Sequence, residues 1–199
     1  FFADLKPLKL FKISGRSGSG KTDVLRVLSQ SHPTLNFEDF AGHAGSAFGR
    51  IPFTDSFGKW QDKSQSFFES QIFISILGRL NGSLVFEDEG RRVGQNLIPN
   101  SLFSQMREAP VIWLSCSLED RIHRVVRDYF PGDYILPYHR YSLKRLKPYI
   151  GAKNWQELLI LLDKGDFAKY CEWLLVNYYD KLYKNKSEAA VLQVFSGDV

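Results

Sequence analysis

One eight-residue segment near the start of the chain has the residue types and the spacing of a phosphate-binding loop. Residues 15–22 read Gly-Arg-Ser-Gly-Ser-Gly-Lys-Thr, which fits the pattern G-x-x-x-x-G-K-[S/T]. Glycines let successive backbone N–H groups point at a phosphate, the lysine adds a cation, and the threonine hydroxyl can bind Mg²⁺. The pattern predicts phosphate contacts at Gly15, Ser17, Gly18, Ser19, Gly20, Lys21 and Thr22, a catalytic role for Lys21, and Mg²⁺ at Thr22. It fits a nucleoside triphosphate, a diphosphate ester and a bare oxyanion equally well.

A run of three acidic residues, Glu87, Asp88 and Glu89, directly follows an expected strand at residues 84–86. A carboxylate at a strand end beside a phosphate-binding loop supports Mg²⁺ or a water. Adjacent carboxylates raise one another's proton affinity, so we expect at least one to face a cation and treat all three as candidate catalytic residues. Arg91 is a further candidate phosphate ligand. The alternative is a solvated acidic turn that pairs with Arg91 and Arg92.

The segment 36–49 combines two acidic residues with three glycines and one histidine. Glycines allow a ligand to approach the backbone closely. His43 is a candidate acid or base, or a donor to phosphate. On composition alone, a flexible surface loop is the favoured interpretation of the segment.

The elements that must position these residues alternate between strand and helix patterns. Strands are expected at 8–13, 34–38, 83–86, 111–116 and 189–195, and helices at 23–31, 65–80, 100–107 and 117–129. This alternation predicts an α/β fold with a mainly parallel sheet flanked by helices, of the P-loop NTPase kind. We expect a P-loop core at 1–132, a helical basic extension at 133–188 with helices at 154–162 and 167–184, and a final strand within 189–199 that returns to the sheet. For the apolar helix at 65–80, core packing is favoured over a role as a tunnel wall.

Two parts of the second half carry clustered cations. Arg121 lies about one turn beyond the end of the strand expected at 111–116, where a lid arginine would contact phosphate, although a solvated basic helix face explains it equally well. Residues 134–156 contain no acidic residue but carry Arg140, Lys144, Arg145 and Lys147 among several tyrosines. Cations suit nucleic-acid phosphates and aromatic rings can stack on exposed bases. Ordinary core aromatics beside surface lysines are the alternative.

The composition is that of a globular protein of 199 residues, with 44% hydrophobic and 24% charged residues and a net charge of +4. It excludes a disordered or collagen-like chain, and no apolar run is long enough to span a bilayer. The two cysteines, Cys116 and Cys171, suit packing in a reducing compartment, so we expect a cytoplasmic protein. The four histidines have no metal-ligand spacing, and no structural zinc is expected.

Three strings in this order and spacing carry a resemblance to a known family. They are G-R-S-G-S-G-K-T, N-F-E-D-F-A-G-H-A-G-S-A-F-G and F-E-D-E-G-R-R-V-G-Q-N-L-I-P, followed by A-P-V-I-W-L and the helix to Tyr129. Together they resemble the P-loop half of tRNA 2-selenouridine synthases, over about two thirds of this chain. The family also has a rhodanese-like module with a catalytic cysteine, either upstream in the same polypeptide or on a separate chain.

The resemblance implies a transferase that converts wobble 2-thiouridine of tRNA to 2-selenouridine through an S-geranylated intermediate. It implies geranyl diphosphate and selenophosphate as substrates and tRNA and the rhodanese-like module as partners. It also favours tRNA contact for the cations Arg140, Lys144, Arg145 and Lys147, over the alternative of a solvated face. Two other functions are compatible with the residues: an ATP-dependent small-molecule kinase, and a nonenzymatic tRNA-binding subunit.

Overall fold

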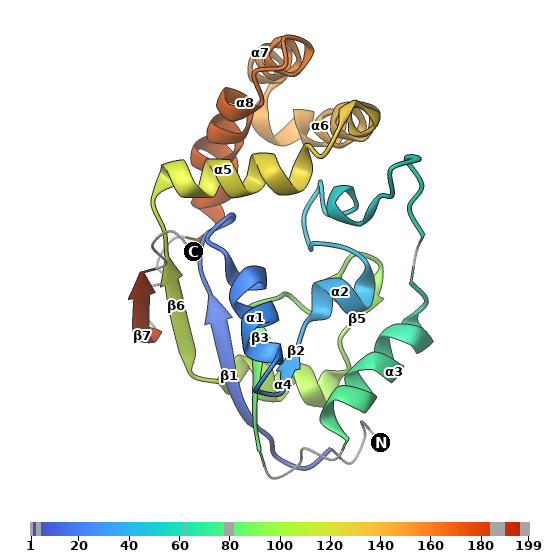
Figure 1. The fold of residues 1–199 in the computed structure, drawn as a ribbon, viewed down its shortest axis with the longest axis vertical. Coiled ribbons are helices and arrows are strands. Elements are labelled where there is room, and N and C mark those ends of the chain that lie inside the picture. Colours follow the sequence, from blue (N-terminus) through green and yellow to red (C-terminus); the bar gives the residue numbers. More distant parts are fainter. Residues whose placement is uncertain (1, 3–4, 62, 78–81, 184–189, 196–199) are drawn as a thin grey trace.

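The computed structural model describes residues 2, 5–61, 63–77, 82–183 and 190–195. Five strands form one sheet in the order β2-β3-β1-β6-β7, and every neighbouring pair is parallel (Figure 1). Their bounds are Lys9–Ser14 for β1, Thr34–Leu35 for β2, Ser83–Glu87 for β3, Val111–Ser115 for β6 and Ala190–Phe195 for β7. The parallel α/β sheet predicted from the alternating pattern is therefore confirmed.

The register of the central strands brings the two candidate site segments together. Ile13 of β1 pairs with Glu87 of β3, so both strands end at the same edge of the sheet. The backbone N–H of Asp88 continues the ladder by donating to the Ile13 carbonyl. The phosphate-binding loop begins one residue after β1 ends. Ligands of open parallel sheets bind at this edge, the carboxyl ends of the strands.

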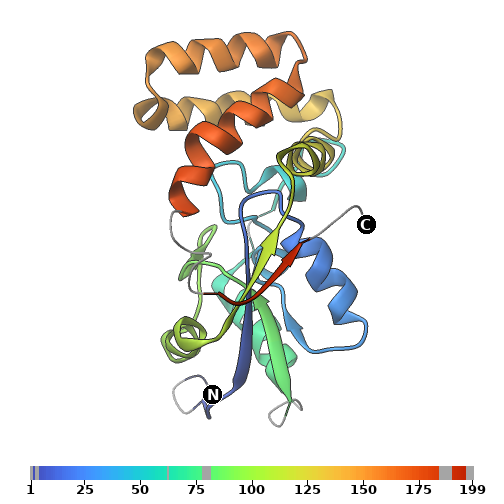
Figure 2. The same ribbon diagram turned by 90° about the vertical axis from the view of Figure 1, so that its left-hand side faces the viewer.

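Helices cover both faces of the sheet. Figure 2 shows α1 on one face and α4 on the other. A core of buried residues from α2, α3, α4 and the strands includes Phe37, Phe68, Phe86 and Leu102. The bounds are Lys21–Ser29 for α1, Phe37–Ala41 for α2, Gln65–Ile76 for α3, Asn100–Glu108 for α4 and Leu118–Tyr129 for α5. Ser117 caps α5 by accepting from the Asp120 N–H, as its residue type predicts.

The strand expected at 34–38 is shorter than predicted. Only Thr34–Leu35 pairs as β2, because Asn36 then caps a short helix by accepting from the Asp39 N–H. The apolar pattern of 34–38 conceals this change of direction. Helix α3 ends at Ile76, and the rest of its predicted range lies outside the described residues apart from Leu77, its C-cap. A two-stranded antiparallel hairpin, β4 (Arg92–Val93) and β5 (Asn96–Leu97), was not predicted.

The acid-free stretch forms a helix whose bounds were not predicted, although it lies within the helical extension expected at 133–188. Helix α6 spans Leu136–Ile150, with Pro137 in its first turn and Pro148 in its last. Proline usually signals a helix break, but a first-turn proline has no intrahelical N–H bond to lose. The two expected helices do follow: α7 at Ala152–Asp163 and α8 at Phe167–Leu174. Beyond α8 the chain continues as a π turn at Leu175–Tyr179 and a 3-10 turn at Asp180–Tyr183.

Helices α5 to α8 form a second layer above the strand ends, here called the helical layer (Figures 1 and 2). Its buried residues form a separate core that includes Leu143, Leu158 and Tyr170 and reaches Phe48 and Ile51 beneath it. The described chain then returns to the sheet, where β7 pairs with β6 as the expected last strand. Among the described residues, no helix combines the length and the apolar character needed to cross a membrane.

Candidate functional site

The loop between β1 and α1 has the backbone of a phosphate-binding nest. Gly18 and Gly20 adopt φ angles of 77° and 88°, a left-handed conformation that side-chain-bearing residues avoid. A Cβ on Gly18 would also lie 2.8 Å from the Arg121 carbonyl oxygen, so the loop packs too closely for any side chain there. Helix α1 begins at Lys21, directly after Gly20. The predicted strand, loop and helix are all present, and the loop (residues 15–22) is called the P-loop below.

Lys21 and Thr22 lie where the motif places them. The Lys21 Nζ donates to the carbonyl oxygens of Gly15 at 3.0 Å and Arg16 at 3.3 Å, so the ammonium group lies across the P-loop. The Thr22 hydroxyl donates to Glu87 Oε1 at 2.8 Å. This contact confirms that at least one of the three consecutive acids reaches the P-loop.

The acidic triplet divides into two roles. Asp88 accepts from the Ser14 hydroxyl at 2.8 Å and pairs with Lys12 at 3.7 Å, which ties it to β1. Glu87, only 1% exposed, and Glu89 face α2, and one carboxylate oxygen from each lies within 4.8 Å of one from Glu38. We call Glu38, Glu87 and Glu89 the carboxylate cluster. Glu38 was not predicted as a site residue, because only the fold brings it to the end of β3.

Burial and repulsion raise the proton affinity of this cluster. The pKa of Glu38 lies well above its usual range because the group is desolvated and faces the negative charges of Glu87 and Glu89, although Lys21 opposes the effect. Burial also raises the pKa of Glu87, against the lowering influence of Lys21 and the Thr22 hydrogen bond. A site that strains carboxylates in this way favours a proton or a cation among them.

A cavity of about 620 Å³ extends from the P-loop into the helical layer. Its polar end is formed by P-loop residues and the carboxylate cluster. Its other end is mainly apolar and aromatic, with contributions from the 3-10 segment Ile51–Phe53, from α5 and from α8 and its π turn. These lining residues include Phe48, Pro52, Phe53, Val125, Tyr129, Phe130, Leu174, Leu175, Tyr178 and Leu182. Helix α3 contributes no residue to this lining, and its Phe68, Ile72 and Ile76 pack in the sheet core, as the sequence favoured.

Arg121 lies at the P-loop but is not placed as a lid arginine. Its side chain is 3% exposed, its Nε donates to the Ser17 carbonyl oxygen at 2.8 Å, and its two terminal nitrogens bind the Asp180 carboxylate at 3.0 and 2.6 Å. The guanidinium is thus committed to holding the P-loop against the turn after α8. This corrects the expectation of an Arg121 that covers a phosphate.

Arg124, one turn further along α5, occupies the position expected of Arg121. It lines the cavity, and a Cβ on Gly20 would touch its guanidinium carbon at 3.4 Å. Its NH1 donates to Cys116 Sγ at 2.8 Å, and this contact helps to fix the position of the Arg124 side chain. The three arginines at 121, 124 and 127 share one spacing pattern, so the sequence alone could not tell which of them faces the loop.

His43 and Arg91 do not join the site. His43 packs edge-on against Trp60 and is enclosed by glycine backbone, since a Cβ on Gly49 would lie 2.5 Å from its ring and one on Gly94 2.8 Å. Arg91 is exposed in the segment before β4. Neither residue lines the cavity, which counts against the expected acid–base role of His43 and the expected phosphate contact of Arg91.

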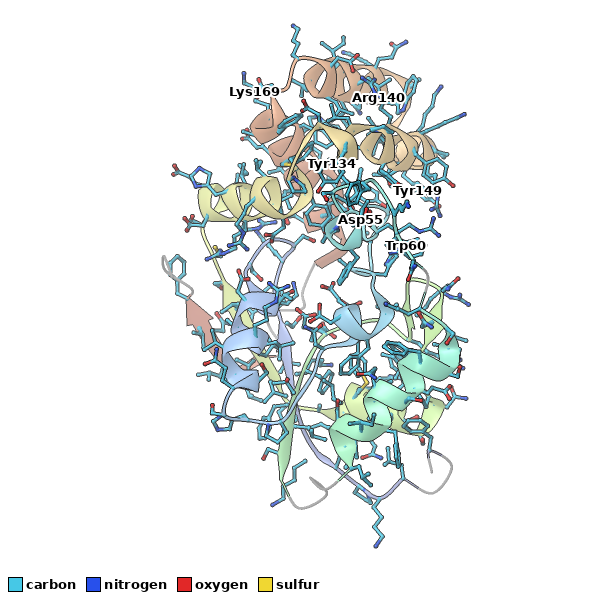
Figure 3. All side chains as sticks on the ribbon, turned by 45° about the vertical axis from the view of Figure 1, so that its right-hand side comes forward. Asp55, Trp60, Tyr134, Arg140, Tyr149 and Lys169 are labelled. Atoms are coloured by element: carbon cyan, nitrogen blue, oxygen red, sulfur yellow. The ribbon has the colours of Figure 1, made fainter. Side chains whose placement is uncertain are left out.

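The four cations proposed for nucleic-acid contact all lie on α6, in the helical layer (Figure 3 labels Arg140). Arg140 pairs with Asp163 of α7 at 2.5 Å, and the Lys147 ammonium lies 4.5 Å from the centre of the Trp155 ring. Lys144 and Arg145 are exposed. All four cations are exposed, and two of them, Arg140 and Lys147, also contact α7.

The cysteines behave as packing residues. Cys171 is buried on α8, and burial raises its pKa to about 12, so its thiol stays protonated. Cys116 follows β6 and is half-buried against Arg124. Neither arrangement resembles a zinc site, and among the described residues the carboxylate cluster is the one group whose ligand atoms converge as a metal would require.

Comparison with known proteins agrees with this architecture. Residues 8–198 match the family described as "tRNA 2-selenouridine synthase AAA domain". The chain is 31% identical over 217 residues to the tRNA 2-selenouridine synthase of Cupriavidus pinatubonensis, covering 94% of this chain and 56% of that protein. It is 34% identical over 125 residues to that of Nitrosomonas europaea, covering 61% and 31%. The chain thus spans little more than half of the first of these relatives.

Among solved structures, a shikimate kinase from Acinetobacter baumannii in complex with shikimate is a distant likeness, with a TM-score of 0.39 and 15% identity over all of this chain and 89% of the other. The family match covers almost the whole length and includes the P-loop, the carboxylate cluster and the helical layer. The chain belongs to the tRNA 2-selenouridine synthase AAA domain family.

Proposed function

We propose that this chain is the geranyl-transferring part of a tRNA 2-selenouridine synthase and that it binds geranyl diphosphate in the P-loop cavity. The observation that carries the proposal is the two-part lining of that cavity. A phosphate-binding loop forms one end, and apolar and aromatic side chains form the other. A prenyl diphosphate has the same two parts, a doubly phosphorylated head and a branched hydrocarbon tail.

The head would bind at the P-loop. Backbone N–H groups between Gly18 and Thr22, the start of α1 and the Lys21 ammonium together favour a multiply charged anion. Arg124 adds a guanidinium group above Gly20. Arg121 supports the site indirectly, because its Nε donates to the Ser17 carbonyl oxygen and so holds the loop in place.

The tail would lie among the aromatic residues under α5 and α8. Burying each methylene-sized group of a hydrocarbon contributes roughly 0.8 kcal/mol, so an apolar chamber gives a prenyl chain a large advantage over a bare diphosphate. The ribose and base of a nucleoside are polar, and the same apolar chamber would leave their polar groups without partners. The lining therefore favours a prenyl diphosphate over ATP, although both heads suit the P-loop.

The reaction that follows is an alkylation of sulfur. The sulfur of wobble 2-thiouridine attacks C1 of the geranyl group, the C1–O bond breaks, and its electron pair leaves with the diphosphate. The uracil ring loses its N3 proton. The chain's contribution is to position the two substrates and to stabilise the charge of the departing diphosphate through Lys21, Arg124 and the loop N–H groups. Replacement of the geranylated sulfur by selenium from selenophosphate would involve the rhodanese-like module as partner.

The exposed cations of α6 are the proposed tRNA contacts, above all Lys144 and Arg145, which do not share the α7 contacts that engage Arg140 and Lys147. Positive side chains on one helix give sequence-independent attraction for RNA phosphates. A cytoplasmic location, where tRNA is found, suits this role and the protonated buried thiol of Cys171.

Equilibrium binding of radiolabelled geranyl diphosphate tests the proposal. We expect wild type to bind it, Lys21→Ala to lose at least about tenfold in affinity because the head loses its cation, and Lys153→Ala, an exposed lysine on α7, to match wild type. ATP is measured in parallel. ATP binding and turnover without geranyl diphosphate binding would establish the kinase alternative. Binding of tRNA by a chain that ignores both ligands, unchanged in Lys21→Ala, would establish the nonenzymatic alternative.

A further inference from the structure

Three carboxylates from different parts of the chain converge at the polar end of the cavity. Glu38 comes from α2, Glu87 ends β3, and Glu89 follows it. One oxygen of each lies within 4.8 Å of the others, a spacing that a single ion between them can bridge. Gly45 contributes to this arrangement, since a Cβ there would lie 2.6 Å from Glu89 Oε2. The absence of a side chain at Gly45 is what lets the Glu89 carboxylate occupy its position.

The buried member of the cluster has an oxygen without a partner. Glu87 Oε1 accepts the Thr22 hydroxyl, but Glu87 Oε2 is buried and has no hydrogen-bond partner within the described part of the chain. No ion pair within 4.0 Å among the described residues includes Glu38 or Glu87. A buried carboxylate oxygen without a hydrogen-bond partner lowers the stability of the folded chain, unless a bound ligand or ion interacts with it.

We propose that Glu38, Glu87 and Glu89 bind one divalent, oxygen-preferring cation, of which Mg²⁺ is the natural example, at the polar end of the cavity. All the donors are carboxylate oxygens, the ligand type that such hard cations select. The site differs from the one expected from the motif alone. The Thr22 hydroxyl donates to Glu87 and so orients a metal-binding carboxylate, in place of binding the metal itself.

The role of this cation rests on the proposed function, because it would act on the bound diphosphate. A diphosphate at the P-loop would otherwise lie beside up to three carboxylates, and the nearby Lys21 ammonium is already shared with the Gly15 and Arg16 carbonyls. A divalent cation between the two negative groups turns this repulsion into attraction. The cation and the diphosphate should therefore each strengthen the binding of the other, by the same factor.

Binding of Mn²⁺, followed by the loss of its free-ion paramagnetic resonance signal, tests the site without any enzyme assay. We expect one Mn²⁺ per wild-type chain, displaced by Mg²⁺ and bound more tightly when inorganic diphosphate is present. Glu38→Gln and Glu87→Gln should each weaken Mn²⁺ binding by at least about tenfold. Asp39→Asn is the matched control: it removes a carboxylate next to Glu38 whose side chain is already bound by Asn36, and should change affinity by no more than about twofold. Circular dichroism confirms that each variant is folded.

Two results would overturn the cation site: no Mn²⁺ binding by the wild-type chain, or equal binding by wild type and both glutamine variants. The proposed function is judged separately, by geranyl diphosphate binding in the presence and absence of EDTA. Geranyl diphosphate binding without any Mn²⁺ binding removes the cation site alone. Mn²⁺ binding without geranyl diphosphate binding retains the cation site and removes the proposed function.

Discussion

At the scale of single residues, the P-loop depends on the absence of side chains. Gly18 combines a φ of 77° with a carbonyl oxygen of α5 that would lie 2.8 Å from any Cβ. We predict that Gly18→Ala lowers the free energy of unfolding by about 1–2 kcal/mol, the cost of a left-handed alanine. It should weaken geranyl diphosphate binding by roughly tenfold or more, because the loop N–H groups rotate away from the head. Chemical denaturation and equilibrium binding measure the two effects.

Gly90→Ala is the control for this substitution. Gly90 lies beside the same cavity, but a Cβ there meets no atom within 4 Å. Its unfolding free energy and ligand affinity should equal those of wild type. If Gly18→Ala and Gly90→Ala behave alike, the steric account of the P-loop is wrong.

Single residues also show which parts of the site a sequence pattern can predict. Lys21, Thr22 and Glu87 could be predicted because a local motif and a strand end fix where they lie. Glu38 and Arg124 could not, since their roles depend on which neighbours the fold brings to them. His43 shows the reverse error: its residue type suits catalysis, but its ring is enclosed by the backbone at Gly49 and Gly94.

At the scale of elements, the contact between the end of α5 and helix α6 has a pH-dependent strength. His139 of α6 is 2% exposed, its Nε2 lies 2.8 Å from the Tyr129 carbonyl oxygen, and its ring stacks on Phe130 at 4.0 Å. Its Nδ1 is buried with no partner among the described residues, so the charged ring would hold an N–H without an acceptor. Burial accordingly lowers the pKa of His139 to about 4.

This shift predicts how stability changes with pH. The ordinary pKa of histidine is about 6.5, so between roughly pH 4 and 6.5 the unfolded chain binds more protons than the folded one. The contribution of His139 is complete above pH 6.5 and is lost as the pH falls towards 4. Between pH 7.5 and 5 we expect the unfolding free energy to fall by about 2 kcal/mol more in wild type than in His139→Gln. Urea denaturation at the two pH values measures it, and equal slopes in both proteins would contradict the assignment.

Elements differ in how well the sequence predicts them. Strands β1, β3 and β6 and helix α5 have regular patterns with clear ends, and the structure places them where they were expected. Helix α6 lies within the expected helical extension, but its bounds were not predicted. Pro137 in its first turn is compatible with a helix, whereas Pro148 in its last turn removes one intrahelical N–H bond. The predicted second strand ends early because Asn36 caps helix α2, and hydrophobic periodicity does not detect a helix cap.

At the scale of the whole molecule, the cavity exists because the helical layer closes over the strand ends (Figure 2). Arg121 connects the two layers: it binds Ser17 of the P-loop and Asp180 after the π turn, and that turn contributes to the apolar wall. The P-loop and the apolar wall of the cavity are therefore joined through the Arg121–Asp180 ion pair. A helical layer could be predicted from the sequence, but its position over the P-loop could not, because it depends on contacts between residues more than 50 positions apart.

The exposed cations of α6 in the helical layer are the proposed tRNA-binding surface. We expect Lys144→Ala/Arg145→Ala to weaken tRNA binding and to reduce the slope of log affinity against log salt by roughly one to two units, since each lost phosphate contact removes up to about 0.9. Lys6→Ala/Lys9→Ala removes the same charge at the start of β1, at the edge of the sheet opposite the P-loop, and should leave both quantities near wild type. An equal loss in the two double variants would show that net charge alone attracts tRNA and that α6 is no specific surface.

We propose that one cavity binds a diphosphate head and a hydrocarbon tail together. The affinities of the same chain for geranyl diphosphate and for inorganic diphosphate, measured by calorimetry in one Mg²⁺-containing buffer, test it most directly. Burial of only four methylene-sized groups contributes about 3 kcal/mol, so geranyl diphosphate should bind roughly a hundredfold more tightly, or better. Equal affinities for the two ligands would contradict the account, because the apolar end of the cavity would then contribute nothing to binding.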